Sequence, residues 1–276
     1  MHNVEIRVKL IAKSSPIDGN VLSWLNEIGA YHFGHENYYD SVEGKITPGE
    51  ELVRLAGKRC YMSYEVGLNP NISRVRDDMT EFIDNILKVG HGSVLEHAHY
   101  TFSIEGVSRV FTGEMNRHRH FNVSEGSMRY IRFDDIPFWI PTSLRPVEED
   151  SQELIVKKSD SIAIFCDLFT KAEEAYKQLI EIWKDELTPE SKFKNKKAIT
   201  SMMRRIIPMG VATGGIWTGN LRGLRHLFEM RCSEHAEEEI LLVASKMLEI
   251  MIKEEPNFFK DFEKVDGFWK PRYHKV

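Results

Sequence analysis

The segment from Arg117 to Tyr130 is the part of the chain best equipped for chemistry. It reads Arg-His-Arg-His-Phe-Asn-Val-Ser-Glu-Gly-Ser-Met-Arg-Tyr and has no amphipathic helical order. Its guanidinium groups present planar forks to a phosphate or to the edge of a pyrimidine, and its serine hydroxyls add further donors. Glu125 supplies an acceptor for a ribose hydroxyl or a ring N–H. The segment predicts an anion-binding loop or, in the simpler interpretation of a charge run, a solvated basic loop.

Several helices are predicted on either side of this loop. Thr47-Pro48 followed by two glutamates is a good helix start, because Thr caps free amides and Pro suits the first helical position. Gly90 stands where a helix with an apolar stripe should end, Ser108 can cap a short helix, and Pro256 should stop a last long one capped by Ser233. The predicted helices cover residues 47–60, 79–87, 108–117, 150–187 and 233–254.

Strand signals are fewer. Apolar residues alternate with polar ones from His99 to Glu105, which favours a strand with one buried face. Glycines punctuate the stretch after Pro208, where a strand or loop is expected. The predicted fold is therefore α+β, helix-rich, with one modest and mostly antiparallel sheet.

The helix at 150–187 carries a regular apolar seam with steps of three and four residues. Such a seam suits helix-to-helix packing, either within the chain or across a subunit boundary. Its members are Ile162, Phe165, Phe169, Ala172, Tyr176, Leu179 and Trp183.

Bulk composition suits one large domain covering residues 1–276, since the chain has 276 residues and is 42% hydrophobic. Within it we expect a core at about 50–255, an irregular N-terminal region at 1–50 and a C-terminal tail at 257–276. A net charge of −5 gives no reason to expect a nucleic-acid or membrane partner. With three cysteines, no signal peptide and no apolar run long enough to span a bilayer, a cytoplasmic protein is predicted.

The Arg117 segment has the spacing of a known signature. Arg-His-Arg is followed after seven residues by Ser127, with Glu125 two places before that serine and Arg129-Tyr130 soon after it. Matching stretches occur upstream at 91–102, with His-Gly, Glu-His and Thr-Phe pairs, and downstream at 204–235. In this pattern the chain resembles the flavin-dependent thymidylate synthases over roughly residues 50–255.

The resemblance implies two sets of site residues and no metal. Residues expected to bind FAD are Ser93, Glu96, Arg117, His118, Arg119, His120, Asn220, His226 and His235. Residues expected to bind dUMP are Glu114, Arg117, Glu125, Gly126, Ser127, Met128, Arg129, Arg204 and Arg231. Ser127 and Arg231 are the catalytic candidates; a cation at the uracil carbonyl edge would stabilise enolate-like charge on the ring.

The reaction implied by the resemblance converts dUMP to dTMP. The carbon donor is 5,10-methylenetetrahydrofolate and the hydride donor is FAD reduced by NADPH, with no covalent enzyme nucleophile. Family resemblance also implies a homotetramer whose active sites are built from several chains.

Some positions depart from the family pattern. Glu114 stands where Gln is usual near the substrate phosphate, and a carboxylate there is repulsive unless it is protonated or paired with an arginine. Ser124 and His226 each replace a common Asn, and Gly126 and Met128 differ in size from the usual residues. These changes keep open an enzyme that modifies another pyrimidine nucleotide or transfers a hydroxymethyl group.

Three other interpretations compete with this one. Cys232 lies beside Arg231 at a predicted helix start, which would activate a thiol nucleophile. His97-x-His99 and His118-x-His120 place paired imidazoles on a strand face, but no further ligands follow at a metal-binding spacing. The same arginine cluster would also serve a nucleotide-binding module without catalysis.

Overall fold

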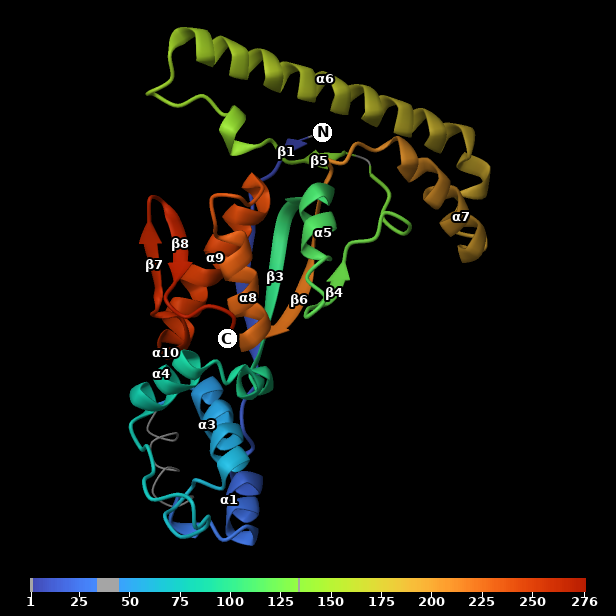
Figure 1. Ribbon diagram of the computed structural model, residues 1–276. Coiled ribbons are helices and arrows are strands. Elements are labelled where there is room, and N and C mark those ends of the chain that lie inside the picture. The colour runs from blue at the N-terminus through green and yellow to red at the C-terminus, as the bar shows by residue number, and fades with distance from the viewer. Residues whose placement is uncertain (1, 34–44, 134) are drawn as a thin grey trace.

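A computed structural model describes residues 2–33, 45–133 and 135–276 and contains a four-stranded sheet (Figure 1). The strands are β2 (Arg7–Lys13), β3 (His99–Ser108), β6 (Ala212–Asn220) and β4 (Asn122–Glu125), in the order β2-β3-β6-β4, and every pairing is antiparallel. Two small sheets accompany it: β1 (His2–Asn3) pairs with β5 (Pro137–Phe138), and β7 (Phe262–Val265) forms a hairpin with β8 (Phe268–Pro271). The predicted α+β class with a modest, mostly antiparallel sheet is confirmed.

The main core lies between this sheet and two helices. The strand predicted at 99–105 buries alternate residues, so that Tyr100, Phe102 and Ile104 are almost fully enclosed. Helices α8 (Leu221–Arg231) and α9 (Glu238–Glu254) lie beside the sheet in Figure 1 and contribute Phe228 and Met247 to the same core. Burial of large apolar side chains on this scale is what fixes the register of β3, because a slip by one residue would expose them all.

Several predicted helix ends are present. Thr47 and Glu50 form a capping box at the start of α3 (Pro48–Tyr61), and α4 (Met79–Val89) ends at Gly90 with a φ of 69°. Ser108 caps α5 (Arg109–Met115) by accepting hydrogen bonds from two backbone amides. Shorter elements are η1 (Gly92–His97), which precedes β3, and α10 (Pro256–Phe259), which follows α9.

The seam on α6 (Gln152–Ile182) packs mainly inside the chain. Phe169 stacks on Phe138 with ring centroids 4.7 Å apart, and Tyr176 is buried in the same second core. The connecting elements are η2 (Thr142–Leu144), η3 (Lys184–Glu186), α7 (Phe193–Met203) and η4 (Arg204–Ile206). Figure 1 shows α6 along one end of the molecule, where Ile164 and Leu168 on its other side are 69% and 54% exposed.

Several predicted boundaries are wrong. The N-terminal region is not irregular in its described part, because β2 joins the sheet and α1 (Asp18–Glu27) follows it; residues 34–44 lie outside the described ranges. Val8 and Leu10 give β2 only a short alternation, although both pack on the main core. The last long helix starts after Glu237, whose side chain caps it in place of Ser233.

The long helix and the end of the chain also differ from expectation. Helix α6 is capped by Ser151 and ends at Ile182, which makes it shorter than the predicted 150–187. Pro256 opens α10 after α9 ends, and the tail continues into the β7–β8 hairpin. Among the described residues, no helix combines the length and apolar character needed to cross a membrane.

Candidate active site

A cavity of about 570 Å³ opens at the start of α8. Four of the residues predicted to bind FAD line it, and they come from three separate parts of the chain: Glu96, His120, Asn220 and His226. Its remaining lining residues are Arg222, Gly223, Lys275 and Val276. The fold therefore brings the upstream, central and downstream motifs of the sequence to one place.

The local fold explains the position of Asn220. Its side-chain oxygen accepts a hydrogen bond from the amide of Gly223 at 2.8 Å, so it is the N-cap of α8. A Cβ at position 223 would lie 3.3 Å from both the Asn220 oxygen and His120 Cβ, which leaves little space for a side chain there. The positive end of the helix dipole consequently lies beside the cavity, where the amides of Leu221 and Gly223 already donate to the Ala98 carbonyl and to Asn220.

Two opposite charges meet at the rim of this cavity. Arg222 Nη1 lies 2.6 Å from Glu96 Oε1, and its Nε donates to the backbone oxygen of Val276 at 3.2 Å. The two side chains of the ion pair are 46% and 47% exposed, so the pair is well solvated. Arg222 escapes prediction from the sequence because no spacing rule connects it with a partner 126 residues earlier.

Arg231 belongs to a second polar cluster with His118 and Glu114. Its Nε donates to His118 Nε2 at 2.8 Å, and its Nη1 lies 3.0 Å from Glu114 Oε2. Burial, followed by the positive charge of Arg231, lowers the pKa of His118 to about 4. A neutral His118 can accept the hydrogen bond, so Arg231 is held by an acceptor on each side.

This cluster clarifies the unusual Glu114. Its carboxylate is paired with an arginine, which is one of the two conditions under which an acid is tolerated near a phosphate. His226 connects the cluster with the cavity, since its ring centroid lies 6.2 Å from that of His118 and 6.3 Å from that of His120.

A second, wider cavity of about 810 Å³ lies along β4 and β6. Glu125, Gly126 and Met128, which are predicted dUMP residues, line it. Arg109 lies 3.0 Å from Glu125 Oε1 and also donates to the Gly126 carbonyl. The other carboxylate oxygen of Glu125 is buried without a hydrogen-bond partner among the described residues. Arg109 is a further residue that the sequence does not reveal, because its partner is distant along the chain.

The remaining predicted residues line neither cavity, and the roles of all the predicted site residues stay predictions. Arg129 donates to Ser201 Oγ at 3.3 Å, and Arg204 begins η4 directly after α7, so both lie near the end of that helix. His235 is 87% exposed and its nearest charged partner is the adjacent Glu234 at 3.6 Å. The others are Ser93, Arg117, Arg119 and Ser127.

The rival nucleophile is wrongly placed for its role. Cys232 lies at the end of α8, whereas the sequence suggested a helix start, and it is completely buried. Burial raises the pKa of its thiol to about 12, so the reactive thiolate is suppressed. Over the ranges that the structure describes, no three metal-ligating side chains gather in one place.

Comparison with known proteins identifies the class. The family described as thymidylate synthase complementing protein matches residues 44–257. A flavin-dependent thymidylate synthase from Mycobacterium marinum is 34% identical over 215 residues, which cover 78% of this chain and 80% of that protein. Another from Mycobacteroides abscessus is 32% identical over 262 residues, covering 94% and 91% respectively.

The same fold occurs in a solved structure with a more distant sequence. A UMP/dUMP methylase, PolB from Streptomyces cacaoi, bound with 5-Br dUMP, superposes with a TM-score of 0.62 at 17% identity, covering 94% of each chain. The chain belongs to the flavin-dependent thymidylate synthase family. The family membership predicted from the Arg-His-Arg signature is thus confirmed.

Proposed function

We propose that this protein converts dUMP to dTMP, with 5,10-methylenetetrahydrofolate as carbon donor and NADPH-reduced FAD as hydride donor. The observation that carries the proposal is the convergence of Glu96, His120, Asn220 and His226 on one cavity. These residues come from three separate parts of the sequence, and the family resemblance alone implies that they bind the flavin.

The cavity at α8 has the features that a flavin cofactor needs. The positive end of the α8 dipole and the Arg222 guanidinium favour the anionic part of the molecule, while His120 and His226 offer rings and nitrogen atoms to its polar edge. Bound there, FAD would supply the hydride chemistry that protein side chains cannot perform. The protein would contribute binding and orientation, and Glu96 would keep Arg222 in position through their ion pair.

Arg231 is the residue that we assign to the uracil. Two acceptors, His118 and Glu114, fix the guanidinium before substrate arrives, so little reorganisation is needed when negative charge develops on the ring. Glu125 would accept a ribose hydroxyl or ring N–H, and Gly126 beside it would permit close approach of the nucleotide.

The proposal includes a single domain, a cytoplasmic location and a homotetramer. One chain distributes the predicted dUMP residues among the cavity along β4, the Arg231 cluster and the end of α7. In the proposed homotetramer, Arg231 of one chain and the cavity along β4 of a neighbouring chain would together form one substrate site. The exposed Ile164 and Leu168 of α6 offer an apolar surface for such an interface.

Turnover with dUMP, NADPH and methylenetetrahydrofolate, with and without added FAD, tests the proposal. We expect dTMP by mass spectrometry, and its formation should depend on FAD. Release of tritium from C5 of the pyrimidine without dTMP would favour hydroxymethyl transfer, and turnover of UMP in preference to dUMP would favour another pyrimidine nucleotide. Absence of any flavin binding would overturn the enzyme assignment.

A further inference from the structure

The last residues of the chain reach the cavity at α8. Lys275 and Val276 line it together with the residues that we assign to the flavin. The family match ends at residue 257, so this part of the wall lies outside the family-wide pattern. The approach is close: a Cβ at Gly92, in η1, would lie 2.5 Å from the carbonyl carbon of Val276.

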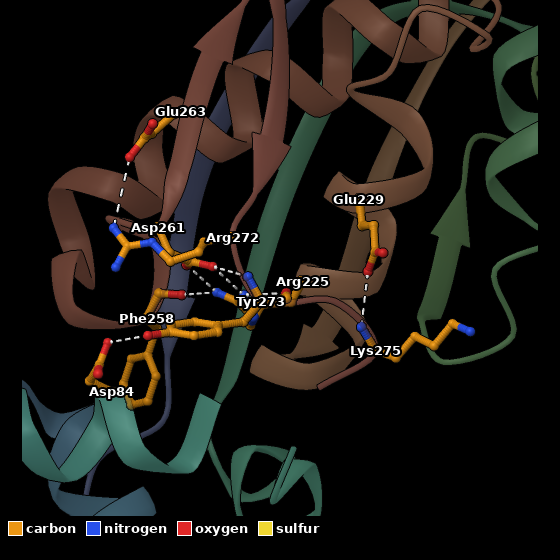
Figure 2. Close-up of polar contacts among 9 residues, drawn as sticks. All are labelled: Asp84, Arg225, Glu229, Phe258, Asp261, Glu263, Arg272, Tyr273 and Lys275. Atoms are coloured by element: carbon orange, nitrogen blue, oxygen red, sulfur yellow. Dashed lines mark hydrogen bonds and ion pairs between the residues drawn. The ribbon is translucent and has the colours of Figure 1, made fainter. Parts of the chain in front are cut away.

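A buried ion pair anchors the segment that leads to the cavity. Arg225 on α8 forms two contacts with Asp261, at 2.8 and 2.9 Å, and both side chains are only 4% exposed. Arg225 also donates to the carbonyl of Tyr273, whose hydroxyl donates to Asp84 on α4 at 2.8 Å (Figure 2). Because these contacts join three elements, the residues that follow Tyr273 have a fixed starting point.

Glu229 sets the conformation of the final turn. Its two carboxylate oxygens contact His274 Nδ1 at 2.9 Å and the backbone amide of Lys275 at 3.4 Å. Lys275 has a φ of 54°, a left-handed conformation that is uncommon for a residue with a side chain. Such a conformation persists only where surrounding contacts hold it, and it often accompanies a functional position.

The charge at Lys275 is available for a ligand. Arg222 is paired with Glu96 in the same cavity, whereas the Lys275 ammonium has no ion-pair or hydrogen-bond partner among the residues that the structure describes. Figure 2 shows its side chain extending away from the Arg225–Asp261 pair. Lys275 and the N-terminal end of α8 thus line one cavity, and the ammonium charge and the positive end of the helix dipole both favour an anion there.

We propose that Lys275 is a cofactor-binding residue whose ammonium contacts a phosphate group of the flavin. This assignment rests on the proposed function, which places the flavin in this cavity. FAD and FMN carry phosphate, whereas riboflavin has the same ring without it. Comparing the affinities of the three flavins therefore distinguishes a contact to the phosphate from a contact to the ring.

The test measures dissociation constants for FAD, FMN and riboflavin by flavin fluorescence in the full-length protein. For Lys275→Gln we expect FAD and FMN to bind about five- to tenfold more weakly, corresponding to one lost charged contact, with riboflavin unchanged. Lys275→Arg should restore most of the affinity. Lys270→Gln is the matched control, because Lys270 is exposed on β8 and lines neither cavity.

Three results would overturn the assignment. Equal FAD affinity in Lys275→Gln and wild type would show that Lys275 does not contact the phosphate. Tighter FAD binding by Lys275→Gln would show that the Lys275 side chain obstructs the cavity. An equal loss for all three flavins would indicate a structural role for the turn. Wild-type protein that binds none of the flavins would overturn the proposed function itself, and the Lys275 assignment with it.

Discussion

The cavity at α8 and the groups assigned to dUMP differ in how completely one chain assembles them. Around the cavity, residues from η1, the Arg117 loop, α8 and the segment at Lys275 meet at one open pocket. The dUMP groups lie in separate places: Glu125 lines the cavity along β4, Arg231 is paired with His118 and Glu114, and Arg129 lies near α7.

This difference follows from what holds each region. The four predicted flavin residues that line the cavity lie on or beside elements of the main core, such as η1 and α8, whose positions are fixed by buried contacts. The predicted dUMP residues are spread over elements of both cores: Arg231 is on α8, Glu125 is on β4, and Arg129 lies near α7. Four of the predicted flavin residues therefore share one cavity within a single chain, whereas the proposed substrate site needs a neighbouring chain to bring its groups together.

The largest expected effect comes from Arg231→Ala on the substrate side. Loss of a preorganised cation at the developing charge should lower kcat by about a hundredfold or more. FAD affinity should stay near wild type, because Arg231 does not line the cavity at α8. Steady-state kinetics and flavin titration measure the two effects. Arg74→Ala is a control on an exposed arginine, and equal activity in the two variants would refute the role of Arg231.

Asp261→Asn should weaken the cofactor side and the fold together. It leaves the buried Arg225 without its charge partner, which should cost about 3 kcal/mol of unfolding free energy. FAD should bind more weakly because the chain end loses its anchor. Chemical denaturation and flavin titration measure both quantities. Asp266→Asn is the control, since Asp266 is exposed in the hairpin turn at a φ of 53°, which Asn tolerates. Equal stability of the two variants would show that the Arg225–Asp261 pair does not anchor this segment.

Glu114→Gln should have a smaller effect, and it should favour binding. Replacing the carboxylate leaves the positive charge of Arg231 uncompensated, so the KM for the dianionic dUMP should fall about threefold. The amide can still accept the hydrogen bond, and kcat should change little. A KM that rises would show that Glu114 contacts the nucleotide rather than Arg231.

The protonation of His118 gives a finer test of the same cluster. Its pKa is lowered from 6.5 to about 4, so the native side chain stays neutral while the unfolded chain takes up a proton. Stability contributed by this group is therefore retained above pH 6.5 and decreases as the pH falls toward 4. NMR titration should show His118 neutral at pH 5.5, and Arg231→Ala should raise its pKa. Titration near 6.5 in wild type would contradict the arrangement.

The smallest effect is expected for Cys232→Ala. The buried thiol, with a pKa raised to about 12, cannot act as nucleophile, so turnover should stay within about twofold of wild type. Complete loss of turnover in a folded Cys232→Ala protein would restore the covalent mechanism.

Local rules predicted much of the fold. The caps at Thr47 and Ser108, the end of α4 at Gly90 and the alternation in β3 all depend on neighbouring residues, and each is confirmed. Strand β2 was missed because its burial depends on pairing with β3, about ninety positions later in the sequence.

The site shows the same limit. The motif residues His120 and Asn220 could be identified because the family pattern specifies their spacing. Their partners could not be predicted, because they are brought close only by the tertiary fold. Arg109 pairs with Glu125, Arg222 pairs with Glu96, and Lys275 lines the cavity at α8. Long-range ion pairs have no signature in the local sequence.

Mixing two inactive variants tests most directly whether the substrate side is shared between chains. Arg231→Ala and Glu125→Ala chains, each expected to be strongly impaired alone, would be co-expressed with different tags and purified as mixed oligomers. If the two residues of one site come from different chains, random mixing restores both in about a quarter of the sites, and dTMP formation should recover accordingly. Mixed oligomers that remain as inactive as the separate variants would show that a single chain supplies both residues, and would contradict the account.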